Sequence, residues 1–467
     1  MERTRIGEVP NKIGETVTLK GWVQIRRDLG KMIFIELRDR WGVVQVLFTP
    51  EKTELLAEAN RLRTEWVIEL EGIVKERPSK NHNPNHPTGT VEIEATGMKV
   101  LNESETPPFA IDTDGKEIGE EHRMEYRYLD LRRERMKKNM MLRDQVIHFI
   151  RNWLHGKDFV EIETPILTKS TPEGARDYLV PSRLYPGNFY ALPQSPQQYK
   201  QLLMISGIER YFQIARCFRD EDTRGDRQPE HTQLDLEMSF VNREDVLSLL
   251  EDLMISIVKT HAPEKKFSQI PFPRIPYTEA MEKYKSDKPD LRENKEDPNE
   301  LAFAWVVDFP MFEKTDDGGW SYGHNPFSGI QEESWQDVME KKNLGDIVST
   351  QYDLVLNGYE LGSGSIRNHK RDLLLKVFEI LGHSPEKMEE NFGHFLTAFK
   401  YGVPPHGGMA WGLDRVVMLL ANEPNIREVI AFPKTGDARD LLMNSPSEVE
   451  QTQLKELGLQ VHKVKSP

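Results

Sequence analysis

Residues 218–235 read FRDEDTRGDRQPEHTQLD. Two apolar segments, Tyr211–Phe218 and Leu234–Phe240, flank this charged run, so the sequence predicts two strands joined by a polar loop. Side chains alternate between the two faces of a strand, and every second residue of each arm therefore points to the same face. Such a face can gather arginines for a phosphate chain and carboxylates for an amine or a metal ion. A run of mixed charge is also common on a solvated surface, so the pattern alone leaves both interpretations open.

The composition limits the kind of protein that this chain can be. Its 467 residues predict two or three domains, and its formal net charge is −14. This balance excludes a protein that coats nucleic acid or membranes by bulk electrostatics, so a polyanionic partner must be bound by a local basic face. The one cysteine, Cys217, predicts no intrachain disulfide and no cysteine-based zinc site. No long apolar run or N-terminal signal is visible, and we expect a cytoplasmic protein with no membrane partner.

The first hundred residues alternate strand-like segments with short turns. Five such segments, with a helical stretch between the third and the fourth, predict an OB-fold barrel over residues 1–104. The expected strands are Thr16–Arg26, Met32–Arg38, Gly42–Thr49, Trp66–Glu76 and Gly89–Val100, and the expected helix is Glu51–Arg63. Phe34 points away from the aliphatic face of its strand, whereas Arg26 is expected on an outer face and Arg27 in the turn that follows. These residues and Gln45 form a candidate surface for stacking and reading unpaired bases, with packing under a loop as the alternative for Phe34.

Three segments of the second part of the chain resemble the three motifs of the class II aminoacyl-tRNA synthetases. The charged hairpin resembles motif 2, in which Phe-Arg-x-Glu precedes a loop and an acidic strand. GGMAWGLDRVVMLL, residues 407–420, resembles motif 3, and a helix over Met141–His155 with a strand over Phe159–Leu167 resembles motif 1. The amino-acid sequences of the motifs and of the barrel, where RRDLG precedes IFIELRDR, are similar to those of the bacterial aspartyl-tRNA synthetases.

This resemblance implies a fold and an activity. The fold is α+β: an OB-fold for the anticodon, a hinge over residues 105–140, and a class II catalytic domain with an antiparallel sheet flanked by helices over residues 141–467. The activity is ligation: an enzyme of this family activates L-aspartate with ATP and Mg²⁺ to aspartyl-adenylate and transfers the aspartyl group to the 3′ end of tRNA(Asp). Motif 1 forms the subunit interface of the family, so a homodimer is expected.

The resemblance also assigns roles to residues of this chain. The expected catalytic residues are Arg219 and Arg415. The residues expected to bind aspartate are Glu173, Ser195, Gln197, Lys200, Asp235, His324 and Arg367. The residues expected to bind ATP are Arg219, Glu221, Gln228, His231, Glu360, Gly412, Leu413, Asp414 and Arg415, and those expected to bind Mg²⁺ are Asp353 and Glu360. The residues expected to contact the anticodon are Arg27, Leu29, Phe34 and Gln45.

Elementary chemistry agrees with several of these roles. Amino-acid activation is an in-line attack on a phosphate, so fixed guanidinium groups can supply much of the catalysis by positioning and charge stabilisation. Asp353 and Glu360 would lie on opposite faces of an unbroken strand, but Asn357-Gly358 is a turn signal that can bring both carboxylates to one face. Mg²⁺ favours one or two carboxylates together with phosphate oxygens and water.

The helix expected after residue 194 serves the aspartate pocket. Ser195 is predicted to be its N-cap and Pro196 its first residue. Gln197 and Lys200 then lie on one helical face. The resemblance implies that Lys200 and Arg367 present two cations to the side-chain carboxylate of the substrate.

Three features depart from the family pattern. His231 stands where a phenylalanine stacks on adenine, and an imidazole has less apolar area and can become charged near pH 6.5. Asn325 replaces the second of two histidines. An insertion domain of roughly a hundred residues, within the usual domain size, would stand near residues 293–300, and a short polar stretch bridges that gap here.

Two other functions stay open at this point. One is a non-discriminating enzyme that charges tRNA(Asp) and tRNA(Asn); Leu29 favours discrimination, because family members with relaxed recognition often carry histidine there. The other is a catalytically silent tRNA-binding paralogue. The intact set of site residues, including Arg219, Glu221 and Arg415, argues against that paralogue.

Overall fold

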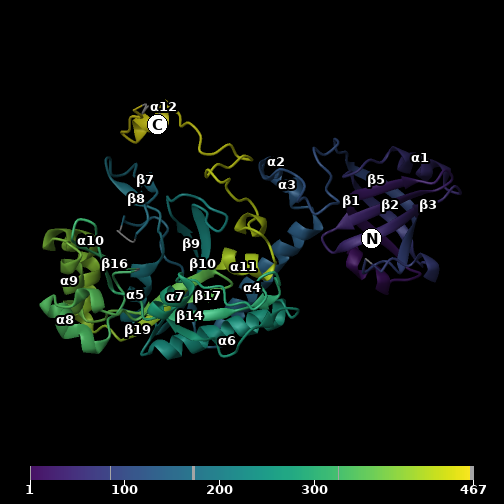
Figure 1. Ribbon diagram of the computed structural model, residues 1–467. Helices are drawn as coiled ribbons and strands as arrows, with labels where there is room; N and C mark the ends of the chain where they lie inside the picture. The colour runs from purple at the N-terminus through teal and green to yellow at the C-terminus, as the bar shows by residue number, and fades with distance from the viewer. Residues whose placement is uncertain (1, 85, 171–173, 324, 463–467) are drawn as a thin grey trace. The chain divides into compact units, whose positions relative to one another are not determined.

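The chain folds into two compact units in the computed structural model, which describes residues 2–84, 86–170, 174–323 and 325–462. The first unit comprises residues 1–119 and 132–134, and the second comprises residues 120–131 and 135–467 (Figure 1). The segment expected as a hinge, residues 105–140, therefore contributes to both units. Within the described part of the chain, no helix is long and apolar enough to cross a membrane.

The first unit is built on a closed five-stranded barrel with the strand order β1-β2-β3-β5-β4. Its elements are η1 (Ile6–Asn11), β1 (Thr16–Asp28), β2 (Ile33–Asp39), β3 (Gly42–Phe48), α1 (Thr53–Arg61), β4 (Val67–Glu76), η2 (Ser79–Asn81) and β5 (Val91–Asn102). Aliphatic side chains such as Leu19, Ile35 and Val46 fill the interior. The helix between the third and fourth strands and this closure confirm the predicted OB-fold.

A register shift in β1 after Val23 changes which arginine faces outward. Beyond the shift, Arg26 pairs with Ile35 of the barrel interior, and Arg27 pairs with Phe34. Directly opposed residues of two strands share a face, so Arg27 joins Phe34 on the outer surface. The expected outward position of Arg26 is therefore wrong, and Arg27 lies in β1 instead of in the turn.

The second unit is organised around an eight-stranded sheet with the order β12-β14-β17-β18-β19-β10-β9-β6. Its strands are β6 (Val160–Glu161), β9 (Arg210–Phe218), β10 (Glu230–Ser239), β12 (Arg274–Pro276), β14 (Phe303–Val307), β17 (Gln351–Leu356), β18 (Tyr359–Ile366) and β19 (His406–Gly412). The pairings are antiparallel except at the two edges, where β12 runs parallel to β14 and β6 runs parallel to β9. The predicted antiparallel sheet is thus confirmed, with parallel edge strands that the sequence did not indicate.

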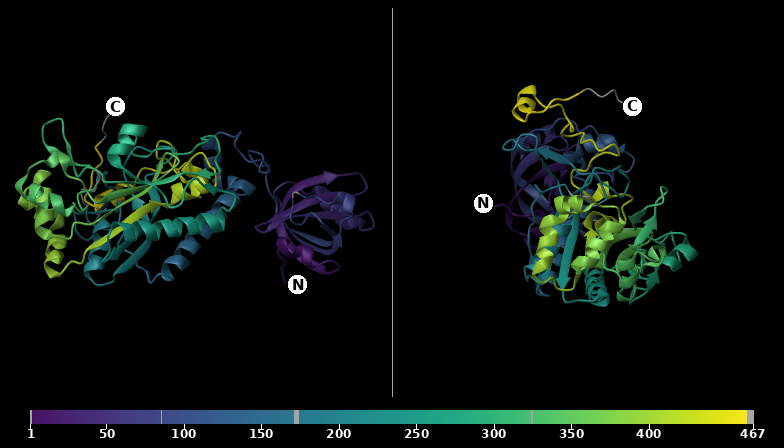
Figure 2. Two further views of the ribbon diagram at one scale, coloured as in Figure 1. Left: turned by 60° about the horizontal axis from the view of Figure 1, so that its bottom comes forward. Right: turned by 90° about the vertical axis from the view of Figure 1, so that its left-hand side faces the viewer.

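The two faces of this sheet differ in chemistry. Helices α4 (Glu134–His155) and α6 (Arg243–His261) contribute to one large apolar cluster with the strands, and α6 runs along the sheet in Figures 1 and 2. Leu234 and Leu236 of β10 point into this cluster. Because side chains alternate along a strand, Gln233 and Asp235 point to the opposite face, which is polar.

Smaller elements surround the sheet. The remaining helices are α2 (Glu120–Glu125), α3 (Arg127–Asp130), α5 (Gln197–Ile205), α7 (Tyr277–Tyr284), α8 (Trp335–Glu340), α9 (Arg371–Ile380), α10 (Pro385–Ala398), α11 (Leu413–Leu420) and α12 (Gln451–Glu456). The short strands are β7 (Leu179–Pro181), β8 (Phe189–Ala191), β11 (Lys266–Phe267), β13 (Glu300–Leu301), β15 (Phe312–Lys314) and β16 (Trp320–Tyr322), and the 3₁₀ turns are η3 (Glu332–Ser334), η4 (Leu344–Asp346), η5 (Phe399–Tyr401) and η6 (Ile426–Val429). Helices α8, α9 and α10 gather at one end of the unit (Figure 1).

Motif 1 differs from the sequence prediction at both of its elements. Helix α4 begins at Glu134 and not at Met141. Asn139 and Arg135, in this added part, donate hydrogen bonds to Glu423, so contacts from far along the chain hold it against the rest of the unit. The expected strand Phe159–Leu167 pairs with the sheet only at Val160–Glu161.

A short loop between α7 and β13 contains the residues that bridge the expected insertion point. Asp290 and Arg292 form an ion pair of 2.7 Å. The carboxylate of Glu300 accepts hydrogen bonds from the backbone of Glu293 and Asn294, each of 3.0 Å. The bridge is therefore a compact turn fixed by its own side chains.

Candidate active site

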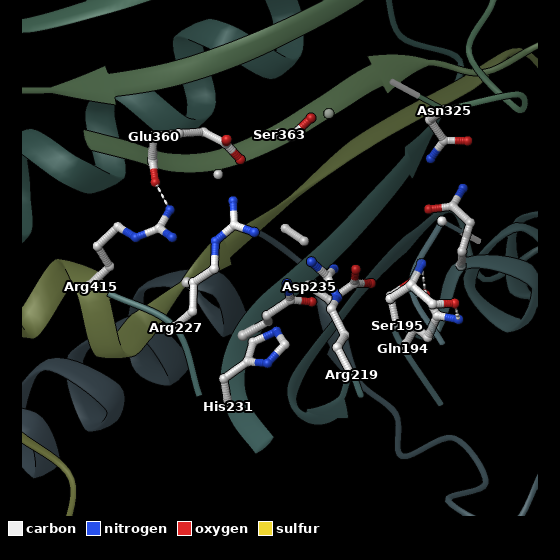
Figure 3. A pocket seen from close by; sticks show the side chains of 18 of the residues that line it. Gln194, Ser195, Arg219, Arg227, His231, Asp235, Asn325, Glu360, Ser363 and Arg415 are labelled. Carbon is white, nitrogen blue, oxygen red and sulfur yellow. Dashed lines mark hydrogen bonds between the residues drawn. The ribbon is translucent and has the colours of Figure 1, made fainter. Parts of the chain in front are cut away.

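A cavity of about 430 Å³ opens on the polar face of the sheet (Figure 3). Its lining contains these residues of the predicted site: Ser195, Gln197, Lys200, Arg219, Glu221, Gln228, His231, Asp235, Glu360, Arg367, Gly412, Asp414 and Arg415. Glu173 and His324 lie outside the described residues. Asp353 and Leu413 do not belong to the lining, and the side chain of Leu413 is buried in the apolar cluster. An ATP contact of Leu413 would therefore fall to its backbone.

Three arginines occupy one part of this cavity. Arg219 follows β9, Arg227 comes from the loop between β9 and β10, and Arg415 lies in the first turn of α11 as the sequence predicted. Figure 3 shows the three side chains near one another, with His231 beside them. Arg415 donates to the backbone oxygen of Glu360. Guanidinium groups held in this way suit a chain of phosphates, because each presents a fork of N–H donors.

His231 is neutral at physiological pH. Burial, and then the positive charges of Arg219, Arg216 and Arg415, lower the pKa of His231 to about 3. The expectation that this imidazole becomes charged near pH 6.5 is wrong, because the sequence does not reveal how many cations surround the ring. The neutral ring is suited to stacking against a flat ligand beside the arginines.

A second part of the cavity is lined by Lys200, Asp235 and Arg367, which form a buried charge network with Glu237 behind them. Lys200 lies 2.7 Å from Asp235 and 3.5 Å from Glu237. Arg367 donates to both carboxylate oxygens of Glu237, at 2.8 and 3.0 Å. The two cations expected to face the substrate are thus balanced by two carboxylates of β10, of which Asp235 was an expected site residue and Glu237 was not.

Glu237 is the functional residue that the sequence reasoning missed. It lies two residues after Asp235 on β10, so alternation along the strand puts both carboxylates on the polar face. The carboxylate needs the space next to Gly408 on β19, where an added Cβ would collide with Glu237 and with the backbone oxygen of Leu236. Glycine at position 408 therefore makes room for the network.

Two polar atoms in this region are unused within the described part of the chain. Oδ1 of Asp235 and Nε2 of Gln197 are buried without a hydrogen-bond partner there, and both residues line the cavity. A buried acceptor and a buried donor are each costly unless a ligand satisfies them. An amino acid has an ammonium group, which can donate to the unused oxygen of Asp235, and a carboxylate or carbonyl oxygen, which can accept from the unused N–H of Gln197. Ser195 lines the cavity but is not the N-cap, since α5 begins at Gln197 with Pro196 before it.

Asp353 and Glu360 share one face of the sheet, as the turn signal predicted. Asn357 and Gly358 form the turn with positive φ angles of 51° and 85°, and Val355 pairs with Glu360. Asp353 is two residues before Val355 and points to the same side. Asp353 itself is buried and accepts a hydrogen bond of 3.0 Å from Gln351, so only Glu360 reaches the cavity.

The electrostatics of this acidic pair bear on metal binding. Burial, and then the charge of Glu360, raise the pKa of Asp353 well above its usual range. In the described residues there is no group of three or more His, Cys, Asp or Glu side chains that would enclose a metal ion. Of this pair, the cavity therefore offers a cation the carboxylate of Glu360.

Two other expected ATP residues are tied to the protein. The amide of Gln228 accepts from the backbone N–H of Lys434 at 2.7 Å and donates to its oxygen at 3.1 Å. The carboxylate of Asp414 is bound by Arg143 and accepts from the backbone of Thr232 at 3.0 Å. Both side chains line the cavity but also fix its walls, Gln228 by holding the loop after β9 to a segment from late in the chain.

The candidate anticodon surface lies on the first unit. Arg27 pairs with Glu36 at 3.2 Å, and Gln45 donates to Glu92 at 2.8 Å. Phe34 is half-buried next to Arg27, and Leu29, in the turn after β1, is 67% exposed. The four expected residues therefore come from neighbouring strands and one turn of the barrel.

An OB-fold barrel followed by an antiparallel sheet, with arginines and a buried charge network on its polar face, defines the architecture of a class II tRNA synthetase. The family described as tRNA synthetases class II (D, K and N) matches residues 119–436, and the OB-fold nucleic acid binding domain matches residues 17–101. The chain belongs to the class II tRNA synthetases of this D, K and N group.

Individual relatives and a solved structure are similar to this chain over most of its length. The chain is 44% identical to an aspartate–tRNA(Asp/Asn) ligase of Rubrobacter xylanophilus over 96% of this chain and 95% of the relative. It is 42% identical to an aspartate–tRNA ligase of Geobacillus kaustophilus over 99% of each chain. The fold is similar to that of asparaginyl-tRNA synthetase from Pyrococcus horikoshii complexed with asparaginyl-adenylate, with a TM-score of 0.74, 23% identity, and coverage of 93% of this chain and 98% of that one. The predicted resemblance to bacterial aspartyl-tRNA synthetases is confirmed.

The lengths of these alignments bear on the missing insertion. The alignment with the Rubrobacter protein runs over 573 positions, whereas 96% of the 467 residues of this chain is about 450. More than a hundred positions of the relative therefore lack a counterpart here. This difference supports an insertion domain that this chain lacks.

Proposed function

We propose that this chain is an aspartate–tRNA ligase that activates L-aspartate with ATP and transfers the aspartyl group to the 3′ end of tRNA(Asp). The observation that carries the proposal is the buried network of Lys200, Arg367, Asp235 and Glu237 beside three arginines in one cavity. A dicarboxylic amino acid and a polyphosphate are the pair of ligands that suits these two neighbouring regions.

The first half-reaction follows from the residues. The side-chain carboxylate of aspartate binds Lys200 and Arg367, and its ammonium group binds the unused oxygen of Asp235. An oxygen of the α-carboxylate then attacks the α-phosphorus of ATP while the bond to pyrophosphate breaks. Arg219 neutralises the charge that develops on the α-phosphate, and Arg415 holds the far end of the phosphate chain. The attacking carboxylate is already ionised, so no general base is required.

Two further groups complete this proposed step. Glu360, with Asp353 behind it, would hold Mg²⁺ together with phosphate oxygens, and the ion would neutralise negative charge on the phosphates. His231, as a neutral ring next to the arginines, would stack against the adenine. In the second half-reaction, a hydroxyl of the terminal ribose attacks the aspartyl carbonyl, and AMP leaves.

Recognition of tRNA is assigned to the barrel. Arg27, Phe34 and Gln45 would contact the anticodon, with Phe34 as a stacking platform. Leu29 at the edge of this surface supports strict recognition of tRNA(Asp). We also propose that the protein acts as a homodimer through α4 and β6, the elements of motif 1, because this is the subunit interface of the family.

Two assays test these assignments. Aspartate-dependent exchange of pyrophosphate into ATP should occur, and asparagine should not support it. Charging of purified tRNA(Asp) and tRNA(Asn) with aspartate should succeed with the first and fail with the second. Pyrophosphate exchange that needs neither aspartate nor asparagine, or that uses the two equally well, would contradict the assigned pocket. Equal charging of tRNA(Asp) and tRNA(Asn) would contradict strict recognition.

A further inference from the structure

Trp41 presents an exposed indole at the turn between β2 and β3. It is 43% exposed, and three guanidinium groups lie over its ring. The distances from the guanidinium carbon to the ring centroid are 4.8 Å for Arg5, 5.5 Å for Arg3 and 5.9 Å for Arg40. These arginines and Trp41, here called the Trp41 patch, come from the N-terminal segment and the turn of the first unit.

Hydrogen bonds from a buried carboxylate hold the backbone of the turn that carries Trp41. The carboxylate of Asp39 accepts hydrogen bonds from the backbone of Trp41 at 2.7 Å and of Gly42 at 3.1 Å. On the other side, the backbone oxygen of Trp41 lies only 3.2 Å from the position that a Cβ on Gly7 would occupy. The backbone of Trp41 is thus held in place while its indole stays exposed, which lowers the entropic cost of ordering this turn when a partner binds.

The Trp41 patch keeps a positive charge. The side chains of Arg5 and Arg3 are 57% and 40% exposed. The nearest carboxylate to Arg5 is that of Glu8, at 3.9 Å, which is a weak surface pair. Asp39 lies 3.4 Å from Arg3, but it is buried and its oxygens also accept backbone N–H groups. Residues 1–104 carry as many basic as acidic side chains, so the patch is a local positive region on a neutral barrel.

The place of the patch on the barrel points to its ligand. Trp41 follows β2, whose other end carries Phe34, so the two aromatic side chains are separated by roughly 20 Å at about 3.3 Å per residue. At the Trp41 end, Arg38 pairs with Glu65 at 2.8 Å. Arg132, two residues after the end of α3, pairs with the same Glu65 at 2.6 Å. The patch therefore lies at the end of β2 that is opposite to Phe34.

We propose that the Trp41 patch binds the phosphate backbone of the anticodon stem of tRNA. The inference rests on the proposed function, since it requires that an anticodon loop is bound at Phe34. A guanidinium that stacks on an indole keeps its N–H edge directed outward, where it can donate to a phosphate. The contact is made to the backbone, so it strengthens binding without reading sequence.

The test measures tRNA binding and charging in two single variants of the full chain, Arg5→Glu and Trp41→Ala. We expect each to raise the KM for tRNA and the Kd by about fivefold or more, and Arg5→Glu to lower the slope of log Kd against log salt by about one. Aspartate-dependent pyrophosphate exchange should stay at the parent value. Lys259→Glu, an exposed charge reversal at the end of α6, serves as the matched control and should change none of these quantities.

The possible outcomes separate the two proposals. Unchanged tRNA binding in Arg5→Glu, with parent-like charging, would overturn the Trp41 patch and leave the proposed function standing. Weaker binding with an unchanged salt slope would also overturn it, because the guanidinium would then not neutralise a phosphate. Failure of the parent chain to charge any tRNA would instead contradict the proposed function. Thermal unfolding of each variant, expected to match the parent for Arg5→Glu, excludes a loss of folding as the cause.

Discussion

Replacement of Lys200 by methionine probes the charge network directly. Lys200 is 2% exposed and is 2.7 Å from Asp235, so Lys200→Met removes a cation and leaves Asp235 buried without it. Loss of one member of a desolvated charge pair with a ligand costs about 2–5 kcal/mol. At about 1.4 kcal/mol per factor of ten, kcat/KM for aspartate should fall by roughly 30- to 4,000-fold. The KM for ATP should change little, because Lys200 lies with the acidic network and not with the three arginines.

The same substitution affects stability. Removal of one partner of a buried ion pair costs about 3–5 kcal/mol, which urea unfolding detects. The double variant Lys200→Met/Asp235→Asn removes both charges and should recover most of this stability. It should not recover aspartate activation, since neither the cation nor the carboxylate that binds the ammonium is present. Measured together, exchange and unfolding separate the role in binding from the role in folding.

One result would refute this reasoning. If Lys200→Met activates aspartate at close to the parent efficiency, the substrate carboxylate does not bind at Lys200, whatever happens to stability. Lys259→Met, an exposed lysine on α6, is the control and should keep parent values in both assays.

Three further substitutions test other parts of the site. His231→Phe should keep or lower the KM for ATP in pyrophosphate exchange. Because the pKa of His231 is lowered to about 3 in the folded protein, only the unfolded chain protonates this histidine as pH falls below 6.5. In acid unfolding, His231→Phe should therefore lose less stability than the parent as pH falls from 6.5 toward 3. Phe34→Ala should weaken tRNA charging by about 1–3 kcal/mol, the cost of a lost base stack, with exchange unchanged; equal damage to both activities would contradict the assignment of the barrel. Asp353→Asn should raise stability at neutral pH, because the raised pKa of Asp353 makes ionisation costly in the folded state. The same variant should weaken the Mg²⁺ dependence of exchange. A less stable variant would contradict the raised pKa of this buried carboxylate.

The sequence by itself determined the architecture. Five strands with a helix between the third and fourth gave the barrel, and the order of the three motifs gave the class II sheet. Strand alternation placed Asp235 on the polar face, and the Asn357-Gly358 turn placed Asp353 and Glu360 on a common face. The class II sheet was inferred from the resemblance of the motifs to a known family. The other predictions rest on local periodicity and turn chemistry, which a short stretch of chain specifies without the rest of the molecule.

The tertiary structure alone decided the electrostatics of the site. Glu237 and Arg367 are separated by 130 positions, yet they meet because β10 and β18 both pair with β19. The pKa of His231 depends in the same way on burial and on arginines that come from β9, from the residue after it and from α11. The register shift that exchanges Arg26 for Arg27 on the outer face depends on pairing between β1 and β2. Periodicity tells which side of a strand a residue faces. The strand order and register of the folded sheet decide which charges and which strands lie next to that residue.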